Sequence, residues 1–453
     1  MNSYSSYQNI SDGWIDKIPK HWGTIKTKYV SEFRNGFSYK SDEWKEVGIP
    51  VIRMSNIGED GKLKITNKNL KYVSSESYEN TKNYLIKKND ILISMTDMNP
   101  LMLWLGSTII FDSDELYLQN QRVGNIRITD QNVNSKFYHY MSNTDIVRNQ
   151  LKVSVYPNVQ TNLSTEPIKN EVFPLPPLPE QTQIVSFLDT KTQKIDELIE
   201  KTEQKIELLK EKRTSLINHC VTKGLNPNVE MKDSGVEWIG EIPSHWIKTK
   251  MKYVVHIFGR IGYRGYTTED IVNKGEGVIT ISPSNIREDK FSTENSTYLS
   301  WEKYHESPEI QIFTNDIILV KTGSTIGKTS IIPNNVPEMT INPQLVVLKN
   351  IKLFSKYLYY QTTCRFIKES FYIEQTGSST PTISQEKMNE FPILNPPNEE
   401  QTKIVEYLDK QTQNIDSTIE KETQRTELLK EYRQSLISEV VTGKVDVSGL
   451  ILN

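Results

Sequence analysis

The sequence is poor in cysteine and histidine and contains no long apolar run. Its 453 residues include two cysteines, Cys220 and Cys364, and six histidines. Neither residue type forms a cluster with metal-ligand spacing, so we expect no zinc site, redox pair or disulfide framework. No stretch reaches the ~18–20 apolar residues of a membrane span, and residues 1–14 lack the basic and apolar regions of a secretory signal. These absences favour a cytoplasmic protein that holds no metal.

The chain also lacks an excess of either charge. It carries 54 Lys and Arg against 57 Asp and Glu, which gives a formal net charge of −3. A chain with this balance is not a general polycation, so any nucleic-acid surface on it must be local. Hydrophobic residues make up 36% of the chain and aromatic residues 9%, which is enough to fill the cores of two to four domains.

What the sequence does contain is an internal repeat. Residues 14–30 (WIDKIPKHWGTIKTKYV) match residues 238–254 (WIGEIPSHWIKTKMKYV), and residues 180–222 match residues 400–442 with 26 of 43 positions identical. Between these blocks the two halves diverge. Each half is therefore a variable body followed by a near-constant segment, which predicts two bodies of one shape that bind related but distinct ligands.

The near-constant segments have the apolar spacing of coiled-coil helices, with steps of 3, 4 or 7 residues. The first seam is Ile184, Leu188, Ile195, Ile199, Ile206, Leu209, Leu216 and Cys220, and the second is Ile404, Leu408, Ile415, Ile419, Thr426, Leu429, Leu436 and Val440. Polar helices with so narrow a seam are marginal alone, and the two seams are each other's obvious partners. We expect an antiparallel pair related by a pseudo-two-fold axis. A coiled coil that only dimerises the protein is the plainer alternative.

The variable bodies mix short strand-like runs (49–54, 90–93, 278–281, 317–320) with turns and short helix-like segments (136–143, 355–364). The predicted fold class is α+β, with two globular bodies joined by two long helices. The predicted boundaries are a first body at 1–178, a helix at 179–223, a linker at 224–237, a second body at 238–398, a helix at 399–442 and a tail at 443–453.

Motifs that suggest an enzyme all fall short of their patterns. Residues 322–329 (TGSTIGKT) resemble a phosphate-binding loop, but Gly323 and Gly327 stand one residue too close together and the first half has no counterpart. Residues 395–398 (NPPN) resemble an adenine-methyltransferase motif but lack the aromatic residue that stacks on a flipped base. His21 and His245 recur beside Trp22 and Trp246, where a packing role is the better interpretation. We expect no catalytic residues.

The remaining polar clusters suit DNA reading, because Arg can bind guanine edges, Asn and Gln suit adenine, and Lys and Ser suit phosphates. For any single one of these residues, plain solvent exposure is the commoner explanation. In the first body the candidates are Arg34, Asn35, Tyr39, Arg53, Ser55, Asn56, Thr96, Asn99, Asn120, Gln121 and Arg122. In the second body they are Arg260, Tyr263, Arg264, Tyr266, Ser284, Asn285, Lys321, Ser324, Lys328, Asn342 and Gln344.

Several motifs together resemble one family. They are SGVEWIGEIPSHW (234–246) with its reduced copy DGWIDKIPKHW (12–22), the Pro-rich lead-in to EQxxIVxxLD, the LLKExRxSLI helix, the VTKG and VTG endings (221–224, 441–443) and the string NDIILVKTGSTIGKT (315–329). In these features the sequence resembles the specificity (S) subunits of type I restriction-modification systems, over residues 12–449.

The resemblance implies two target-recognition domains, each reading one half of a bipartite, asymmetric site in double-stranded DNA. It implies that the helix pair spaces the domains and docks two modification (M) subunits, which carry S-adenosylmethionine and methylate adenine. Restriction (R) subunits that use ATP and Mg²⁺ would join in some systems of this bacterial defence. No cofactor is expected in this chain itself.

The first half departs from the family pattern in two loops. Residues 93–106 (ISMTDMNPLMLWLG) replace a T-G-S-x-x-G-like turn, and residues 156–164 lack the glycine of their counterpart, residues 376–384. Two other classes of function stay open on sequence alone. One is a self-sufficient methyltransferase or nucleotide-dependent nuclease, and the other is a coiled-coil scaffold.

Overall fold

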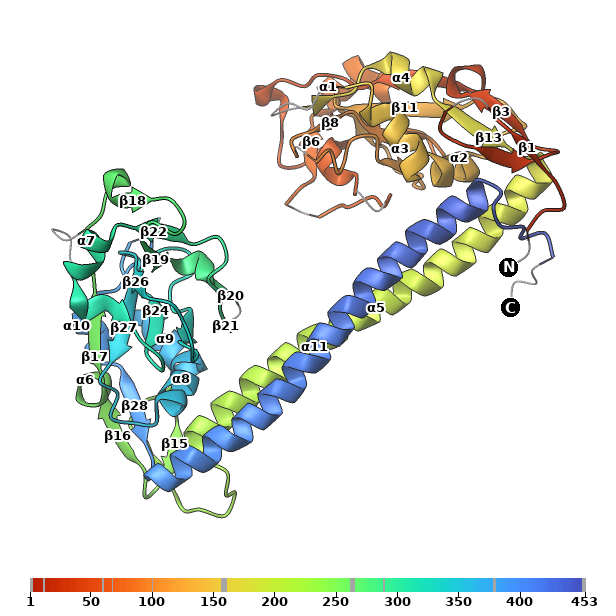
Figure 1. Ribbon diagram of the computed structural model, residues 1–453. Coiled ribbons are helices and arrows are strands. Elements are labelled where there is room, and N and C mark those ends of the chain that lie inside the picture. The colour runs from red at the N-terminus through yellow and green to blue at the C-terminus, as the bar shows by residue number, and fades with distance from the viewer. Residues whose placement is uncertain are drawn as a thin grey trace. The chain divides into compact units, whose positions relative to one another are not determined.

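A computed structural model describes residues 3–10, 13–58, 61–66, 68–99, 101–155, 161–260, 265–287, 290–377 and 380–449. The chain divides into two compact units (Figure 1). Unit 1 comprises Met1–Thr202 with Gln424–Asn453, and unit 2 comprises Glu203–Thr423. Each unit contains one mixed body of helices and strands together with part of each of two long helices.

The body of unit 1 is built on an antiparallel sheet in the order β4-β11-β7-β9, beside a smaller sheet in the order β10-β5-β6. All four residues of β7, the apolar run ILIS, are buried, as expected for a central strand. The strands are β1 (Tyr7–Asn9), β2 (Lys17–Pro19), β3 (Gly23–Lys26), β4 (Ser31–Asn35), β5 (Ile49–Ile52), β6 (Lys71–Val73), β7 (Ile91–Ser94), β8 (Thr96–Asp97), β9 (Thr108–Ile110), β10 (Leu118–Gln119), β11 (Val123–Ile128), β12 (Thr161–Asn162) and β13 (Val172–Leu175).

Four short helices complete this body: α1 (Ser75–Thr81), α2 (Ser135–Ser142), α3 (Asp145–Lys152) and α4 (Thr165–Asn170). The side chains of Asn134 and Thr144 accept hydrogen bonds from the first backbone N–H groups of α2 and α3, which fixes where both helices begin. Phe137 and Met141 on the buried face of α2 join Ile93 and Ile126 of the sheet in one core.

Unit 2 repeats this plan with an antiparallel sheet in the order β17-β27-β24-β25 and a five-stranded sheet in the order β18-β22-β19-β26-β23. Its strands are β14 (Met231–Asp233), β15 (Glu241–Pro243), β16 (Ile247–Lys250), β17 (His256–Gly259), β18 (Ile271–Val272), β19 (Val278–Ile281), β20 (Ile286–Arg287), β21 (Lys290–Phe291), β22 (Thr297–Leu299), β23 (Gln311–Ile312), β24 (Ile317–Val320), β25 (Thr329–Ile331), β26 (Met339–Ile341), β27 (Leu345–Lys349) and β28 (Pro392–Asn395). Its helices are α6 (Met251–Val254), α7 (Trp301–His305), α8 (Ser355–Thr363), α9 (Arg365–Glu374) and α10 (Gln385–Asn389). The α+β class and the shared plan of the two bodies are confirmed.

The two long helices are α5 (Leu178–Lys223) and α11 (Asn398–Val441). In unit 1 the first part of α5 packs with the last part of α11 in the core of the body, through Ile184, Leu188, Leu436 and Val440. In unit 2 the last part of α5 meets the first part of α11, where Cys220 lies in one core with Ile404 and Leu408. The helices therefore run antiparallel within each unit, as the paired seams predicted.

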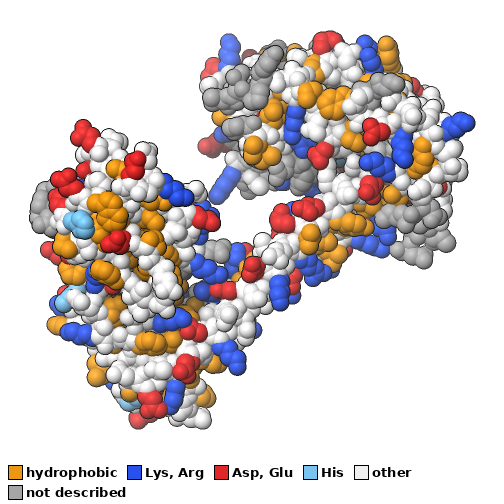
Figure 2. Space-filling model, in the orientation of Figure 1, with side chains coloured by type: hydrophobic (Ala, Val, Ile, Leu, Met, Phe, Trp, Pro, Cys, Tyr) orange, Lys and Arg blue, Asp and Glu red, His pale blue; other side chains and the backbone are white. Residues whose placement is uncertain are grey.

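The predicted seam residues lie on the inner faces of these helices. Most of them are buried, and Ile199, Leu209, Leu216, Ile419 and Leu429 are half-buried. Figure 2 shows acidic and basic side chains interspersed on the outer faces. The seam also buries threonines that the apolar pattern did not include, such as Thr192, Thr202 and Thr412. Each of these satisfies its hydroxyl by donating to the carbonyl four residues earlier, at 2.7 Å.

Equivalent ion pairs join the helices in both units. Arg433 Nε lies 3.0 Å from Asp196 Oδ1 in unit 1, and Arg213 Nε lies 2.9 Å from Asp416 Oδ1 in unit 2. A lysine of the body reaches the same aspartate in each unit. Lys62 lies 2.8 Å from Asp196, and Lys290 lies 3.3 Å from Asp416. These charges fix the pairing of the helices and attach a loop of each body to them.

The ends of the helices explain the repeated His-Trp and V-T-x-G motifs. Gly224, just after α5, has φ +74° and packs on Trp246, while Gly443, after α11, has φ +73° and packs on Pro19 and Trp22. A left-handed glycine is a common end for a helix. At the other ends, His21 bonds Glu180 (2.9 Å) and His245 bonds Glu400 (2.7 Å), so both histidines anchor the start of a long helix.

None of the helices, over the residues that the structure describes, is both long and apolar enough to cross a membrane.

Candidate nucleic-acid interface

In unit 1 the predicted DNA-reading residues gather at one edge of the main sheet. Asn35 at the end of β4 pairs with Gly124 of β11, and Ser94 at the end of β7 pairs with Val123. The carboxyl ends of β4 and β7 therefore meet the start of β11 at this edge. Residues 34–35, 96–99 and 120–122 all lie there.

A second sheet brings another predicted segment to the same edge. β5 pairs with β10 in parallel, and the Asn120 backbone N–H donates to the Ile52 carbonyl at 3.0 Å. The segment after Ile52 forms the short 3-10 helix η3 (Met54–Asn56). Ser55 on this helix is exposed. We use the name "reading edge" for residues 34–35, 53–56, 96–99 and 120–122 of unit 1.

Some predicted residues at this edge hold the fold together instead of facing solvent. Asn56 is buried, accepts from the Arg53 N–H at 2.9 Å and donates to the Lys64 carbonyl. Thr96 is buried and donates to Asn162 at 2.9 Å. Outside this edge, the hydroxyl of buried Tyr39 donates to Thr81. Base contacts by these side chains receive no support from the structure.

The arginines of unit 1 fall into two groups. Arg34 donates to the Asn83 and Leu85 carbonyls, and Arg53 donates to the Asn69 carbonyl at 2.7 Å. Burial lowers the pKa of both guanidinium groups. Among the described residues, the half-exposed Arg122 guanidinium has no hydrogen bond or ion pair. Asn35, Ser55 and Gln121 are exposed, and Asn99 and Asn120 are half-exposed, so these residues with Arg122 form the accessible part of the reading edge.

Unit 2 has the equivalent edge with different side chains. Gly259 at the end of β17 pairs with Val346, and Val320 at the end of β24 pairs with Leu345. The Asn342 N–H donates to the Ile281 carbonyl at 2.8 Å, which places the 3-10 helix η7 (Pro283–Asn285) beside the turn before β27. The reading edge of unit 2 is therefore residues 260, 282–285, 321–328 and 342–344.

Here too the buried members have internal partners. Arg260 donates to the Ile341 carbonyl (3.2 Å) and to Thr340 (3.1 Å), and its guanidinium lies 5.5 Å from the Tyr266 ring centre. Buried Asn285 accepts from the Ser282 N–H at 2.9 Å, and buried Asn342 bonds Gln344. The accessible members are Ser284, Ser324 and Gln344, which are exposed, and Lys321 and Lys328, which are half-exposed. Tyr266, outside this edge, is half-exposed as well. Tyr263 and Arg264 lie outside the described residues.

The loop that resembles a phosphate-binding loop is a different structure. Residues 321–328 connect the antiparallel strands β24 and β25, whereas a phosphate-binding loop leads from a strand into a helix N-terminus. Burial lowers the pKa of Lys321. In the described part of the chain, no group of three or more His, Cys, Asp or Glu residues could hold a metal ion.

The counterpart loop in unit 1 has another architecture, which the sequence did not predict. Buried Asp97 accepts hydrogen bonds from the backbone N–H groups of Asn99 (2.7 Å), Trp104 (2.6 Å) and Leu105 (3.1 Å). One carboxylate thus replaces the glycine turn of unit 2. Of the other departure, residues 156–160 lie outside the described residues.

Comparison with known proteins agrees with this arrangement. The profile of the family described as "Type I restriction modification DNA specificity domain" matches residues 19–208 and again residues 243–430. The chain belongs to this family. Each match covers one body and most of the long helix that follows it, so the chain contains two copies of the family's domain.

Two relatives named as type I restriction enzyme specificity subunits cover most of this chain. A putative type I restriction enzyme MjaX specificity subunit from Methanocaldococcus jannaschii is 25% identical over 448 residues, which cover 97% of each chain. The EcoBI specificity subunit of Escherichia coli is 24% identical over 344 residues, which cover 73% of this chain and 65% of that one. A solved chain from work on complex assembly and conformational transition of the type I R-M system has a TM-score of 0.67 at 16% identity, over 94% of this chain and 99% of that chain, and shows the same fold.

Proposed function

We propose that this chain reads DNA for a type I restriction-modification complex and has no catalytic residues of its own. The observation that carries the proposal is the presence of two equivalent reading edges that present different side chains. Unit 1 offers Gln121 and Arg122 next to Asn35, and unit 2 offers Lys321, Ser324 and Gln344. Because the two sets differ, the site on double-stranded DNA is bipartite and asymmetric, with one half-site for each unit.

The partner subunits supply the chemistry in this proposal. Two modification subunits dock on the protein and bring S-adenosylmethionine for adenine methylation. Restriction subunits, in systems that have them, bring ATP and Mg²⁺. The helix pair sets the length of the unread spacer between the half-sites. The complex works in the cytoplasm, where it meets DNA.

The test is a map of methylated adenines in cells that express this chain with its modification subunit. We expect a split motif with a fixed gap and two unlike half-sites. A single continuous motif would contradict the proposal. Methylation that does not depend on this chain would do so as well.

Substitutions at one reading edge sharpen the test. Gln121→Ala with Arg122→Ala should relax only one half-site, by about 1–3 kcal/mol per lost base contact. Gln344→Ala with Ser324→Ala should relax only the other half-site. If either pair altered both half-sites, the assignment of one unit to each half-site would be wrong.

A further inference from the structure

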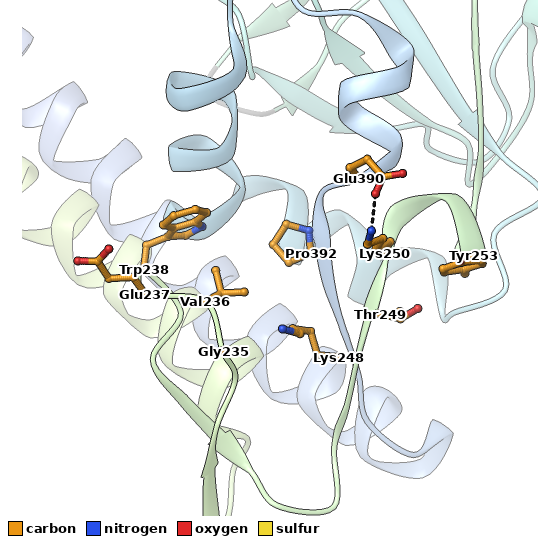
Figure 3. Close-up of a pocket in the computed structure, with 10 residues that line it drawn as sticks. All are labelled: Gly235, Val236, Glu237, Trp238, Lys248, Thr249, Lys250, Tyr253, Glu390 and Pro392. Atoms are coloured by element: carbon orange, nitrogen blue, oxygen red, sulfur yellow. Dashed lines mark hydrogen bonds and ion pairs between the residues drawn. The ribbon is translucent and has the colours of Figure 1, made fainter.

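Unit 2 carries an apolar groove away from its reading edge. The groove has a volume of about 560 Å³ and is lined by Trp238, Lys248, Tyr253 and Pro392, with Glu237, Lys250 and Glu390 also in its lining (Figure 3). A smaller hollow of about 200 Å³ shares Trp238, Glu390 and Pro392 with it. Both hollows therefore continue along the same tryptophan.

The aromatic side chains of this groove recur in unit 1. Trp14 and Tyr29 occupy the positions of Trp238 and Tyr253 in the repeat. Trp14 is 38% exposed and Trp238 40%, while Tyr29 is 69% exposed and Tyr253 59%. Large aromatic residues of this exposure occur singly on most surfaces, but here two of them recur together in both copies.

Part of the polar surroundings recurs as well. Lys28 Nζ lies 5.4 Å from the Tyr29 ring centre, and Lys252 Nζ lies 5.3 Å from the Tyr253 ring centre. Lys28 donates to Asn170 at 2.9 Å, and Lys252 donates at 2.6 Å to Glu390, which holds the equivalent position. The two reading edges have diverged, whereas the tryptophan, the tyrosine and the lysine beside it recur in both units. The other polar residues differ, because Thr24 stands where unit 2 has Lys248 and Asn170 stands where it has Glu390.

The charges at the groove indicate what binds there. Lys250 and Lys252 share the single carboxylate of Glu390, at 2.5 and 2.6 Å. Among the described residues, the exposed Lys248 ammonium has no ion pair. With Glu237, which also lines the groove, three lysines (Lys248, Lys250 and Lys252) stand against two carboxylates, so the rim keeps a positive charge of one. It suits a segment that carries a carboxylate beside an apolar side chain.

We infer that the surfaces at Trp14/Tyr29 and Trp238/Tyr253 are two equivalent docking sites, each for the same acidic-apolar segment of one modification subunit. A surface kept in both units while the reading edges differ fits a partner that is the same in both places. DNA does not meet that condition, because the two half-sites are unlike. The inference rests on the proposed function and adds the docking surface to it.

The experiment measures how many modification subunits co-purify with the full chain, by native mass spectrometry of the co-expressed complex. The wild-type complex should contain two. Trp238→Ala with Tyr253→Ala should leave one, Trp14→Ala with Tyr29→Ala should also leave one, and the fourfold variant should leave none. Each double variant should weaken binding at its own site at least tenfold. Tyr253→Ala alone changes one exposed ring, and it should weaken binding in the same direction if the larger variants fold poorly.

Trp301→Ala is the matched control. Trp301 is 41% exposed in unit 2 but lies outside the groove and packs on Tyr304 and His305. The control should retain two modification subunits. The inference is overturned if the groove variants also retain two at wild-type affinity, or if Trp301→Ala loses one equally. If the wild-type complex still contains two modification subunits and methylates a split motif, such a result refutes the docking surface but not the proposed function. A wild-type chain that binds no modification subunit removes both.

Discussion

Glu171 should make the stability of unit 1 depend on pH. This carboxylic acid is 2% exposed at the end of α4, and among the described residues neither of its oxygens accepts a well-formed hydrogen bond. Burial raises its pKa from 4.5 to about 8, and the nearby Tyr138 hydroxyl offsets only part of that effect. Near neutral pH the folded protein therefore holds a proton on Glu171 that the unfolded chain releases.

The direction follows from proton linkage. The folded state binds the proton more tightly, so the contribution of Glu171 to stability is complete below pH 4.5 and is lost as the pH rises to about 8. At 1.36 kcal/mol per pKa unit, the loss is roughly 4 kcal/mol over this window and roughly 3 kcal/mol by pH 7. Above pH 8 this group adds no further change.

Unit 2 provides the control, because Phe391 occupies the equivalent position. The Thr27 N–H donates to the Glu171 carbonyl (3.0 Å) just as the Met251 N–H donates to the Phe391 carbonyl (2.9 Å). Glu171→Gln keeps the shape of the side chain and removes the titration, while Glu171→Phe copies unit 2. Both variants should flatten the pH dependence of unit 1.

The assay is urea unfolding between pH 7 and pH 9, with a short hydrogen-exchange pulse at one fixed pH to read peptides of each unit separately. The window begins at pH 7 because burial lowers the pKa of His139 in the same unit from 6.5 to about 4, which makes stability rise with pH below that window. The urea midpoint of unit 1 should fall with pH in the wild type and change much less in both variants. The midpoint of unit 2 should be the same in all three proteins. A wild-type pH dependence that survives in Glu171→Gln would refute the reasoning.

Three further predictions concern the helices. Gly443→Ala should destabilise unit 1 by roughly 2–5 kcal/mol, because φ is +73° and the new Cβ would overlap Pro19. Gly224→Ala should destabilise unit 2 by less, because its Cβ would meet Trp246 at 3.2 Å. Urea unfolding of both variants measures the difference. A double-mutant cycle on Arg433→Met and Asp196→Asn should give a coupling free energy of about 1 kcal/mol. In the control cycle, Lys410→Met, an exposed residue of the same helix as Arg433, replaces Arg433→Met and should show no coupling to Asp196→Asn. A coupling near zero for Arg433 and Asp196 would mean that this ion pair does not fix the helices. Inserting one heptad in α5 and a matching heptad in α11 lengthens each helix by about 10 Å, which corresponds to about three base pairs at 3.4 Å each. The methylation map should then show a wider gap between unchanged half-sites. Altered half-sites would contradict the spacer role.

Periodicity and repetition predicted the parts of the fold that depend on local pattern. The seam of α5 and α11 follows from apolar steps of 3, 4 and 7, and the strand-like runs at 278–281 and 317–320 are β19 and β24. The helix-like segments at 136–143 and 355–364 are α2 and α8, to within a residue at each end. These features depend on which side chains must be buried, and the sequence records that directly.

The candidate site was harder to predict, because the same polar residue can face solvent or support a turn. Asn56 and Asn285 were grouped with Ser55 and Ser284, yet the asparagines close their 3-10 turns while the serines are exposed. The signal available in the sequence was that both asparagines stand at the same place in the turn that follows a strand-like run. The role of Asp97 depends on a loop that folds back onto its carboxylate, and no spacing rule describes that loop. The recurring tryptophans were visible in the sequence, but their exposure was not.

The core of unit 1 is closed by residues that are translated after all of unit 2. Leu436, Ile437, Val440, Val441 and Val447 lie in one cluster with Ile18, Trp22 and Phe137, whereas unit 2 uses only residues 203–423. A ribosome that has passed residue 423 has therefore synthesised every part of the second unit, while the first unit still lacks the end of α11. During synthesis the unit that begins first is completed last, and its apolar surface stays open to chaperones for longer. A frameshift near residue 430 would damage the body of unit 1, which is encoded far upstream.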